Sequence, residues 1–304
     1  MLDLIGDIHG HADELERLLQ KLGYKKVSGV YGHPDRKVLF VGDYIDRGPK
    51  IRETLQIVKG MTEMGHAIAL MGNHEYNAIC FHLQNKEGGH LRKHWIKNII
   101  QHYETLKQFQ NRQKEYNEYI EWFLTLPLFY EDKNIRAVHA CWNEKNITFL
   151  KGKLKQNRLT KLLIEEANTT NDTLNNAIEQ TLKGKELRLP DGITFADKDG
   201  NLRKDIRYKW WEDPLKMTFE TISVHHPVEN LPSVSIKAST LDDLSYYKAV
   251  ERPVFFGHYW LKNQPMLFKP NVCCLDYSVA KGGLLVAYRF DGEKELQQDN
   301  FVMA

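Results

Sequence analysis

Short apolar runs alternate with amphipathic stretches in the first third of the chain. The runs at 2–5, 38–41 and 68–71 have the length and apolar content of buried strands. Between them, apolar residues recur at helical spacing over 12–22 and 51–61. This order predicts a β-α-β-α-β series, an arrangement in which open α/β sheets bind ligands at the carboxyl ends of their strands.

A longer helical pattern follows between residues 81 and 126. Its apolar side chains form two stripes in helical phase, and the second stripe ends before Pro127. Lysines and histidines interleave with these aromatic residues, so a nucleic-acid-binding face is an alternative. We interpret the stripes as core packing because the aromatic residues keep the helical phase. The first stripe consists of Trp95, Ile96, Ile99, Ile100, Tyr103 and Leu106, and the second of Tyr116, Tyr119, Ile120, Phe123 and Leu124.

Residues 144–205 are richer in Lys, Asn and Thr, and we predict that they form a helical insertion or cap within a single domain spanning 1–304. The polar stretch 171–173 predicts a helix start, and turns are expected at 190–192 and 199–201. We interpret the insertion as a solvated surface. A lid that attracts phosphorylated substrates is the alternative.

The last quarter of the chain returns to strand patterns, at 254–258, 272–276 and 284–288. Strand, loop and strand of this kind predict a second sheet packed against the first. The fold class is therefore α/β, with two facing mixed β-sheets flanked by helices and a helical insertion. The adjacent pair His225 and His226 would point to opposite faces of a strand, so we do not expect it to be a ligand pair.

The amino-acid composition and charge exclude some classes of binding partner for this protein. The chain has 304 residues, of which 42% are apolar, so it can bury a substantial core. A formal net charge of +2 excludes a general polyanion-binding surface, and we expect no stable nucleic-acid partner. The four cysteines form no CxxC pair, which suits a reducing compartment. Because the N-terminus enters a strand at once and no apolar run reaches about 18 residues, we expect a cytoplasmic protein without a membrane partner.

Each of the three N-terminal strands ends in a Gly turn that carries polar side chains. These turns are Gly-Asp-Ile-His-Gly at 6–10, Gly-Asp-Tyr-Ile-Asp-Arg-Gly-Pro at 42–49 and Gly-Asn-His-Glu at 72–75. A single Asp-rich turn after a strand is often a helix cap. Three such turns at one sheet edge favour a binding site instead, and two later strands end in His139 and His258.

The donors at these strand ends are carboxylate, amide and imidazole groups, with no thiolate among them. Such mixed sites suit Mn, Fe, Zn or Mg better than a Cys-rich structural zinc. Six donors exceed what one catalytic ion binds while it keeps a position for water, whereas two ions that share a bridging carboxylate use all six. We therefore expect two divalent cations, with manganese as the first choice and iron, zinc, nickel or magnesium as alternatives. The six residues are Asp7, His9, Asp43, Asn73, His139 and His258.

These motifs resemble those of the calcineurin-like metallophosphoesterases, and within them the phosphoprotein phosphatase branch and its bacterial relatives. Five motifs carry the resemblance by their order and spacing, over about 1–140 and 250–290, and the insertion is not covered. The resemblance implies a metal-dependent phosphatase in which a metal-bridging hydroxide attacks the phosphoryl group. It assigns the first metal to Asp7 and His9, the bridge to Asp43, and the second metal to Asn73, His139 and His258.

The resemblance also implies the remaining roles at the site. His74 would protonate the leaving oxygen, and Asp46 would orient its imidazole. Arg47 would bind the phosphate oxygens bidentately. A second phosphate-binding arginine of that branch has no secure counterpart here, and we take Arg252, with Arg207 beside it, as the candidates.

Smaller sequence features give conflicting indications about the substrate. Glu75 and Trp260 favour the protein-phosphatase side, and Asp46, an acid that symmetrical dinucleoside tetraphosphatases usually lack, agrees with them. In contrast, the stretch 275–278 followed by Gly-Gly at 282–283 resembles the tail of bacterial dinucleoside polyphosphate hydrolases. We therefore predict a serine/threonine protein phosphatase-like phosphomonoesterase first and a bis(5'-nucleosyl)-tetraphosphate hydrolase as the alternative. Polynucleotide end processing comes third, since the net charge is near neutral.

A non-catalytic scaffold is the competing function class. Such a protein would be expected to have lost His74, Arg47 or a metal ligand, and all of these are present. Cys141 follows His139 closely enough to raise a nucleophile hypothesis, and it stands where protein phosphatases usually carry glycine. We prefer to interpret Cys141 as a small buried thiol.

Overall fold

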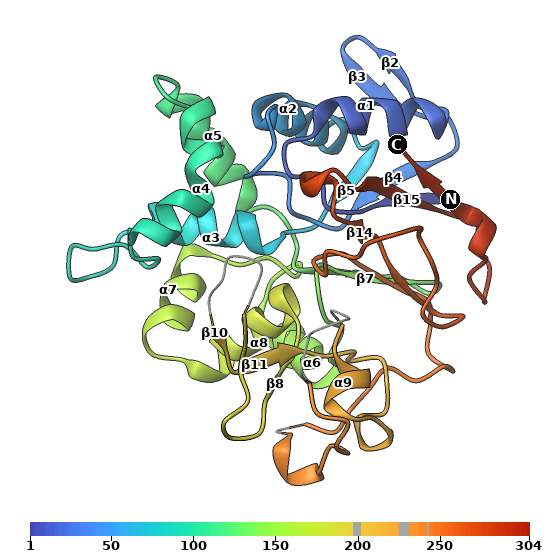
Figure 1. Ribbon diagram of the computed structural model, residues 1–304. Coiled ribbons are helices and arrows are strands. Elements are labelled where there is room, and N and C mark those ends of the chain that lie inside the picture. The colour runs from blue at the N-terminus through green and yellow to red at the C-terminus, as the bar shows by residue number, and fades with distance from the viewer. Residues whose placement is uncertain (197–201, 225–230, 242) are drawn as a thin grey trace.

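A computed structural model describes residues 1–196, 202–224, 231–241 and 243–304. The pair His225 and His226 and the expected turn at 199–201 lie outside the described residues. Helices and strands alternate along the chain, and the strands gather in two main sheets (Figure 1).

The larger sheet has six strands in the order β14-β15-β1-β4-β5, with β16 paired to β15. Strands β1, β4 and β5 run parallel, as the N-terminal β-α-β-α-β pattern predicts, while β15 runs antiparallel to β1. The sheet is therefore mixed. Its strands are β1 (Leu2–Ile5), β4 (Lys37–Phe40), β5 (Ala67–Ala69), β14 (Asp276–Tyr277), β15 (Leu284–Phe290) and β16 (Phe301–Met303).

The second sheet has four strands in the order β13-β12-β7-β6. Three of them run parallel, and β6 pairs antiparallel with β7. The strands are β6 (Phe129–Glu131), β7 (Arg136–Val138), β12 (Val254–Phe256) and β13 (Val272–Cys274). Here too the carboxyl ends of the parallel strands lead directly into candidate site residues.

The two sheets face each other across a shared apolar layer. Phe255 of β12 packs against Tyr288 of β15, with ring centroids 5.2 Å apart, and against Phe290 at 6.0 Å. Both sheets contribute to one cluster of buried side chains that includes Leu39 of β4 and Ala137 of β7. The predicted fold class, two facing mixed sheets flanked by helices, is confirmed.

One strand lies in a different sheet from the one that the sequence predicts. The run at 284–288 was expected in the second sheet with 254–258 and 272–276, but β15 pairs with β1 in the first sheet. The alternation of apolar residues predicts that a strand exists, yet it does not specify the partner, because pairing depends on which strand edge is open.

Helices α1 (Ala12–Lys21) and α2 (Ile51–Glu63) pack beside the larger sheet (Figure 1). Helix α1 buries Leu15, Leu18 and Leu19 completely, and each such leucine stabilises the fold by about 1.5–3 kcal/mol relative to an exposed one. Helix α3 (Asn73–His82) follows β5, and helices α4 (Ile96–Gln108) and α5 (Gln113–Phe123) lie within 81–126, where a longer helical pattern was predicted.

Of the two predicted apolar stripes in this region, one is buried and the other is exposed. The second stripe is buried as expected, with Tyr116 and Phe123 at most 1% exposed. The first stripe on α4 faces solvent, since Ile96 is 77% and Ile100 is 68% exposed. Core packing was therefore the wrong interpretation for the first stripe, and α4 instead buries the polar residues Asn98, His102 and Thr105.

The predicted insertion contains helices and short strands that lie on the far side of the second sheet from α1 and α2 (Figure 1). Helix α8 begins at Asp172, where Asn171 accepts a hydrogen bond from the Leu174 N–H at 2.9 Å, so the predicted helix start is correct. The boundary of 144–205 as a separate unit stays a prediction. Its elements are α6 (Glu144–Lys153), α7 (Lys161–Thr169), α8 (Asp172–Lys183), β8 (Glu186–Arg188), β9 (Phe195–Ala196), β10 (Leu202–Arg203) and β11 (Asp205–Arg207).

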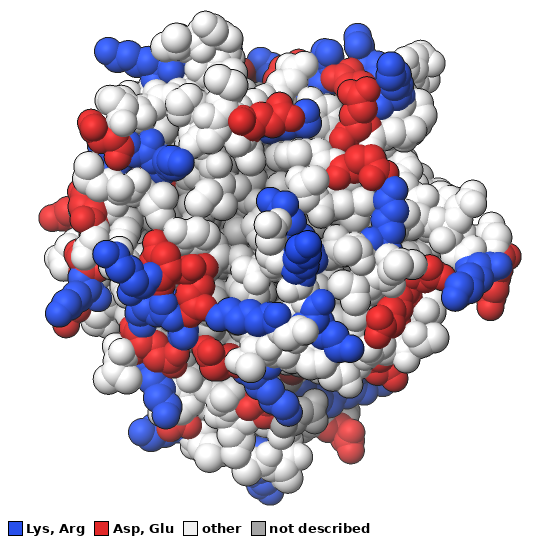
Figure 2. Space-filling model, turned by 180° about the vertical axis from the view of Figure 1, so that it is seen from behind, with Lys and Arg blue, Asp and Glu red and all other residues white. Residues whose placement is uncertain are grey.

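The remaining regular elements are short. Figure 2 shows basic and acidic side chains interspersed over one face of the molecule, in keeping with the near-neutral net charge. Across the described part of the chain, no helix combines the length and apolar character that a bilayer crossing requires. The short elements are β2 (Lys25–Val27), β3 (Val30–Gly32), α9 (Phe219–Ile222) and the 3₁₀ turns Pro214–Lys216, Ala238–Thr240, Val279–Lys281 and Gln298–Asn300.

Candidate metal centre

The turns that follow β1, β4, β5, β7 and β12 meet at one edge of the two sheets. The first turn is joined to the second through its backbone, because the N–H groups of Ile8 and His9 both donate to the Asp43 carbonyl, at 3.0 and 2.9 Å. The last turn is joined to the fourth in the same way, since Gly257 N–H donates to the His139 carbonyl at 2.8 Å. The side chains of these loops are thus positioned by main-chain bonds.

Two glycines allow this close approach of the loops. A Cβ atom built on Gly72 would lie 2.2 Å from Asp43 Oδ1, and one built on Gly257 would lie 1.9 Å from Asp7 Oδ1. Both distances are far below van der Waals contact, so any side chain at these positions would displace a carboxylate. These glycines are therefore needed for the packing of the loops.

Left-handed backbone conformations concentrate in the same loops. The φ angles of His9, Asp43, Asp46 and His258 are +46°, +56°, +67° and +73°, although none of these residues is glycine. Each such conformation costs on the order of 1–3 kcal/mol and persists only where the surroundings enforce it, which is typical of functional sites.

Asp43 occupies the middle of the cluster. Its Oδ2 lies 3.5 Å from His9 Nε2, and its Oδ1 lies 3.4 Å from His139 Nε2. Two groups of potential metal ligands share this carboxylate, His9 with Asp43 and His74, and Asp43 with His139 and His258; within each group the ligand atoms lie within 4.8 Å of one another. One buried carboxylate thus faces two separate sets of imidazole nitrogens that could bind metal.

Backbone carbonyls set the orientation of two of these imidazoles. His9 Nδ1 donates to the Ile45 carbonyl and His139 Nδ1 donates to the Val41 carbonyl, each at 2.9 Å. Because a carbonyl only accepts, Nδ1 carries a hydrogen in each ring, and each Nε2 is directed at the centre. This is the usual way in which proteins prepare histidine to bind a metal.

The second set converges on the Asn73 side chain. Asn73 Oδ1 lies 3.0 Å from His139 Nε2 and 2.7 Å from His258 Nδ1. An amide oxygen and two imidazole nitrogens thus point at one region, each of them a ligand type suited to a transition-metal ion.

Asp7 lies beside Asp43 with one oxygen lacking a partner. Its Oδ2 accepts the His258 N–H at 3.0 Å, whereas its buried Oδ1 has no hydrogen-bond partner among the residues that the structure describes. Burial raises the pKa of Asp7 well above its ordinary value, and the charges of Asp276 and Asp43 add to the effect. An orphaned carboxylate oxygen among buried negative charges is the environment that a bound cation would satisfy, so the donor set fits divalent metal ions.

His74 and Asp46 form a short hydrogen bond next to this cluster. His74 Nδ1 lies 2.5 Å from Asp46 Oδ2, and both side chains are buried. Burial by itself would raise the pKa of Asp46. The electrostatic attraction of His102 and His74 and their hydrogen bonds to the carboxylate outweigh this and hold the pKa well below its ordinary value. Asp46 therefore stays ionised and fixes the imidazole of His74, whose Nε2 faces Asp43 at 3.9 Å.

Arg47 contacts two histidines of the centre and one aromatic ring. Its guanidinium lies 2.9 Å from His9 Nε2 and 3.3 Å from His74 Nε2, and it stacks on Trp260 with Cζ 3.5 Å from the ring centroid. Lys281 Nζ lies 4.1 Å from the centroid of the same ring. Two cations therefore share one aromatic ring at this site.

Glu75 has a structural role that sequence reasoning did not assign. Its fully buried carboxylate accepts hydrogen bonds from the backbone N–H groups of Gly72, Asp43, Tyr44 and Ile45. It thereby joins the second and third Gly turns. The only signal in the sequence was its place in the Gly-Asn-His-Glu motif, which does not reveal the partners.

The two candidate arginines lie in different places. Arg252 is six positions before His258, at the opposite end of β12, where it binds Glu131 and the Asp132 carbonyl. We therefore leave Arg252 out of the site. Arg207 ends β11 close enough to His258 to contribute, after burial, to lowering the pKa of that histidine. Cys141 is buried, which raises its pKa to about 12, so it matches the interpretation as an inert thiol.

Comparisons with known proteins agree with this geometry. The family model described as calcineurin-like phosphoesterase matches residues 2–259. The bis(5'-nucleosyl)-tetraphosphatase PrpE (asymmetrical) of Oceanobacillus iheyensis is 36% identical over 141 residues, which cover 46% of this chain and 54% of that protein. The chain thus spans about half the length of this curated relative.

Solved structures share the fold. A cold-active protein tyrosine phosphatase superposes with a TM-score of 0.53 at 17% identity, over 98% of this chain and 79% of that one. A protein serine/threonine phosphatase from Saccharomyces cerevisiae superposes with a TM-score of 0.51 at 13% identity, over 100% of this chain and 78% of that one. At these identities the likeness concerns the fold alone.

Proposed function

Because the chain belongs to the calcineurin-like phosphoesterase family, we propose that it is a metal-dependent hydrolase of phosphoric esters and anhydrides. The observation that carries the proposal is the position of Asp43, a buried carboxylate that faces His9 on one side and His139 on the other. Such an arrangement suits two metal ions that share one bridging ligand.

The proposed ligand sets follow from the geometry of the loops. Asp7 and His9 would hold one ion, Asn73, His139 and His258 the other, and Asp43 both. Two bound divalent ions would lower the pKa of a bound water and polarise the phosphoryl oxygens. Manganese is our first choice of metal, since mixed oxygen and imidazole ligands without thiolates suit it.

Three side chains would complete the chemistry. His74 would donate a proton to the leaving oxygen through Nε2, because its Nδ1 is bound to Asp46 and the ring is thereby fixed. Arg47 would bind the non-bridging phosphoryl oxygens with its two terminal nitrogens, which already point to His9 and His74. The positive charge of Arg47 would stabilise the charge that develops on those oxygens.

We place dinucleoside polyphosphates first among the substrates, ahead of the phosphoproteins that the sequence first indicated. The relative from Oceanobacillus iheyensis, which its name describes as a bis(5'-nucleosyl)-tetraphosphatase, supports this order. The second cation beside Trp260 supports it too. Lys281 adds a positive charge next to Arg47, where a chain of several phosphates offers more negative charge than a phosphomonoester does.

The test compares kcat/KM of the manganese-reconstituted protein on diadenosine tetraphosphate and on a phosphoserine peptide, with His74→Ala as the blank. We expect the dinucleotide to be preferred by at least about tenfold, about 1.4 kcal/mol in transition-state stabilisation. A preference for the peptide would return the phosphoprotein substrate to first place. Rates at the level of the blank for both substrates would refute the proposed hydrolase.

We also place the protein in the cytoplasm. All four cysteines, Cys80, Cys141, Cys273 and Cys274, are free and buried, which suits a reducing compartment.

A further inference from the structure

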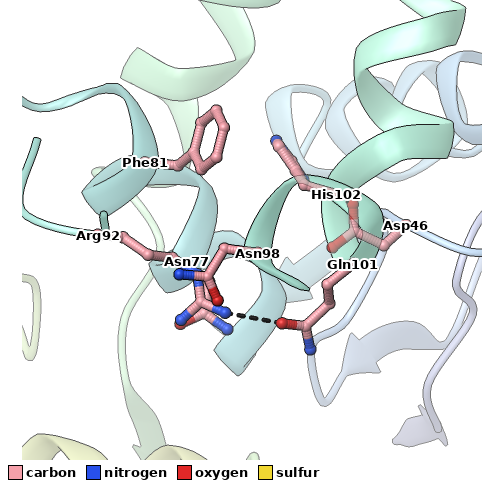
Figure 3. Close-up of a pocket in the computed structure, with 7 residues that line it drawn as sticks. All are labelled: Asp46, Asn77, Phe81, Arg92, Asn98, Gln101 and His102. Atoms are coloured by element: carbon pink, nitrogen blue, oxygen red, sulfur yellow. Dashed lines mark hydrogen bonds and ion pairs between the residues drawn. The ribbon is translucent and has the colours of Figure 1, made fainter. Parts of the chain in front are cut away.

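Helix α4 directs its polar side chains toward Asp46. His102 is 5% and Thr105 is 0% exposed, while Ile96 and Ile100 on the same helix face solvent. A helix that exposes isoleucine and buries histidine and threonine sacrifices hydrophobic stabilisation, so its buried polar residues need an explanation beyond packing. Figure 3 shows His102 next to Asp46, with Gln101 of the same helix, in the lining of a small pocket.

Both buried side chains bind the Asp46 carboxylate on the oxygen that His74 does not use. His102 Nδ1 lies 2.7 Å and Thr105 Oγ1 lies 2.5 Å from Asp46 Oδ1. The other oxygen, Oδ2, is left for His74 Nδ1. Three donors are thus divided over the two oxygens of a single carboxylate.

Thr105 binds Asp46 at two points. Its Oγ1 donates to Asp46 Oδ1 and also accepts the Asp46 backbone N–H, at 3.0 Å. One hydroxyl therefore fixes both the main chain and the carboxylate of a residue whose φ of +67° is unfavourable for aspartate. Neither bond alone would prevent the carboxylate from rotating about its last side-chain bond, whereas the two together oppose that rotation.

Tyr116 of α5 forms a hydrogen bond with His102 on the ring nitrogen that does not face Asp46. Its hydroxyl lies 2.6 Å from His102 Nε2. Because an ionised carboxylate only accepts, His102 Nδ1 donates to Asp46, and His102 Nε2 is left to form the hydrogen bond with the Tyr116 hydroxyl. The contacts thus run from Tyr116 through His102 to Asp46, where both His102 and His74 donate to the carboxylate.

We propose that His102 and Thr105 are positioning residues that hold Asp46, and through it the His74 imidazole, in line with the leaving oxygen. This inference rests on the proposed function, in which His74 is the proton donor. The two residues touch no ligand of the proposed metal centre in the described structure, so their loss acts on proton donation and leaves metal binding intact.

The kinetic test uses leaving groups of different basicity. The variants are Thr105→Val, which keeps the shape and loses the hydroxyl, and His102→Phe, with Thr105→Ser and His102→Asn as conservative rescues. The substrates are phenyl phosphate, whose leaving oxygen needs a proton, and 2,4-dinitrophenyl phosphate, whose leaving oxygen does not. The control is His94→Phe, because His94 lies in the same histidine-rich region but binds the Phe81 carbonyl.

We expect Thr105→Val and His102→Phe to lower kcat about 10- to 100-fold on phenyl phosphate and less than about 3-fold on 2,4-dinitrophenyl phosphate, with KM and metal content unchanged. The conservative variants should recover most of the rate, and His94→Phe should match the wild type. Equal losses on both substrates, or no loss on either, would overturn the proposal.

A spectroscopic arm separates this proposal from the proposed function. A short imidazole–carboxylate hydrogen bond gives a far-downfield proton resonance, which can be recorded on the zinc-reconstituted protein and assigned by its absence in His74→Asn. The resonance should move upfield in Thr105→Val and His102→Phe and stay in place in His94→Phe. An unmoved resonance refutes the positioning role whatever the activity, whereas a wild type that hydrolyses no phosphate ester refutes only the proposed function.

Discussion

Replacing Glu75 by glutamine tests how the Gly turns are joined. Glu75 Oε2 accepts N–H groups from Asp43 and Gly72, each at 2.9 Å, and Oε1 accepts those of Tyr44 at 2.8 Å and Ile45 at 3.4 Å. In Glu75→Gln one oxygen becomes an NH₂ group. Two backbone donors then face another donor inside a region from which water is excluded.

The expected cost follows from these contacts. A hydrogen bond to a charged group contributes about 1.5–3 kcal/mol, so losing the two on one oxygen costs about 3–6 kcal/mol before relaxation. We expect the free energy of unfolding to fall by about 3 kcal/mol, a large part of the roughly 5–15 kcal/mol that holds a typical domain. The metal centre should weaken as well, since the Gly72 and Asp43 loops would no longer be joined.

The assay is urea unfolding followed by tryptophan fluorescence, with metal content measured in parallel. Burial and the charge of Asp43 raise the pKa of Glu75 to about 8, so the unfolding is measured on the alkaline side of that value, where the carboxylate is ionised. The control is Glu179→Gln, because Glu179 pairs with Lys183 at a partly exposed position and should change stability by less than about 1 kcal/mol. A loss in Glu75→Gln no larger than that of the control, with metal content unchanged, would refute the reasoning.

Four further outcomes are expected. Asp43→Ala should lower metal content below two ions per chain, measured by atomic emission, because the shared ligand is lost; two tightly bound ions would contradict this. Lys281→Gln should raise KM about fivefold for diadenosine tetraphosphate and leave 4-nitrophenyl phosphate unaffected, and an equal change for both would remove Lys281 from substrate selection. Burial and neighbouring histidines lower the pKa of His82 to about 4. Because the pKa of His82 in the unfolded chain is about 6.5, neutral His82 stabilises the fold fully above that pH, and this contribution is lost as pH falls toward 4. His82→Phe should therefore recover about 1–2 kcal/mol of the free energy of unfolding near pH 4. An unchanged dependence of stability on pH would argue against this. Burial raises the pKa of Cys141 to about 12, so a thiol reagent should label it in urea but not in the native protein, and Cys141→Ser should keep its turnover.

The candidate site was largely predictable because its signals are local. A Gly turn directly after an apolar run is visible in a few residues of sequence, and parallel strands bring their carboxyl ends to one edge. The residues that the motifs singled out, such as Asp43, His139 and His258, do meet there. Their roles as ligands and catalysts stay predictions until they are measured.

Helix α4 is a case in which the local sequence pattern predicts the helix but not which of its faces is buried. Its periodicity correctly indicates a helix with an apolar face, but which face is buried depends on what lies opposite. The opposite group is the Asp46 carboxylate, 56 and 59 positions away from His102 and Thr105, and a buried carboxylate requires donors. The prediction that Arg252 binds phosphate was wrong for a related reason. Arg252 and His258 lie at opposite ends of one strand, so their side chains cannot meet at the same edge of the sheet.

The sequence by itself determined the main strands of the two sheets, the helices α1 and α2, the Gly turns after β1, β4 and β5, and which potential metal-binding side chains stand at the strand ends. Those features depend on neighbouring residues, whose period and turn chemistry can be read directly. Only the tertiary structure decided that β15 joins β1, that Glu75 joins two loops and that α4 buries its polar side. Each of these depends on contacts between residues that are far apart in the chain, and burial turns such contacts into requirements because an unpaired polar group is costly only where water cannot reach it.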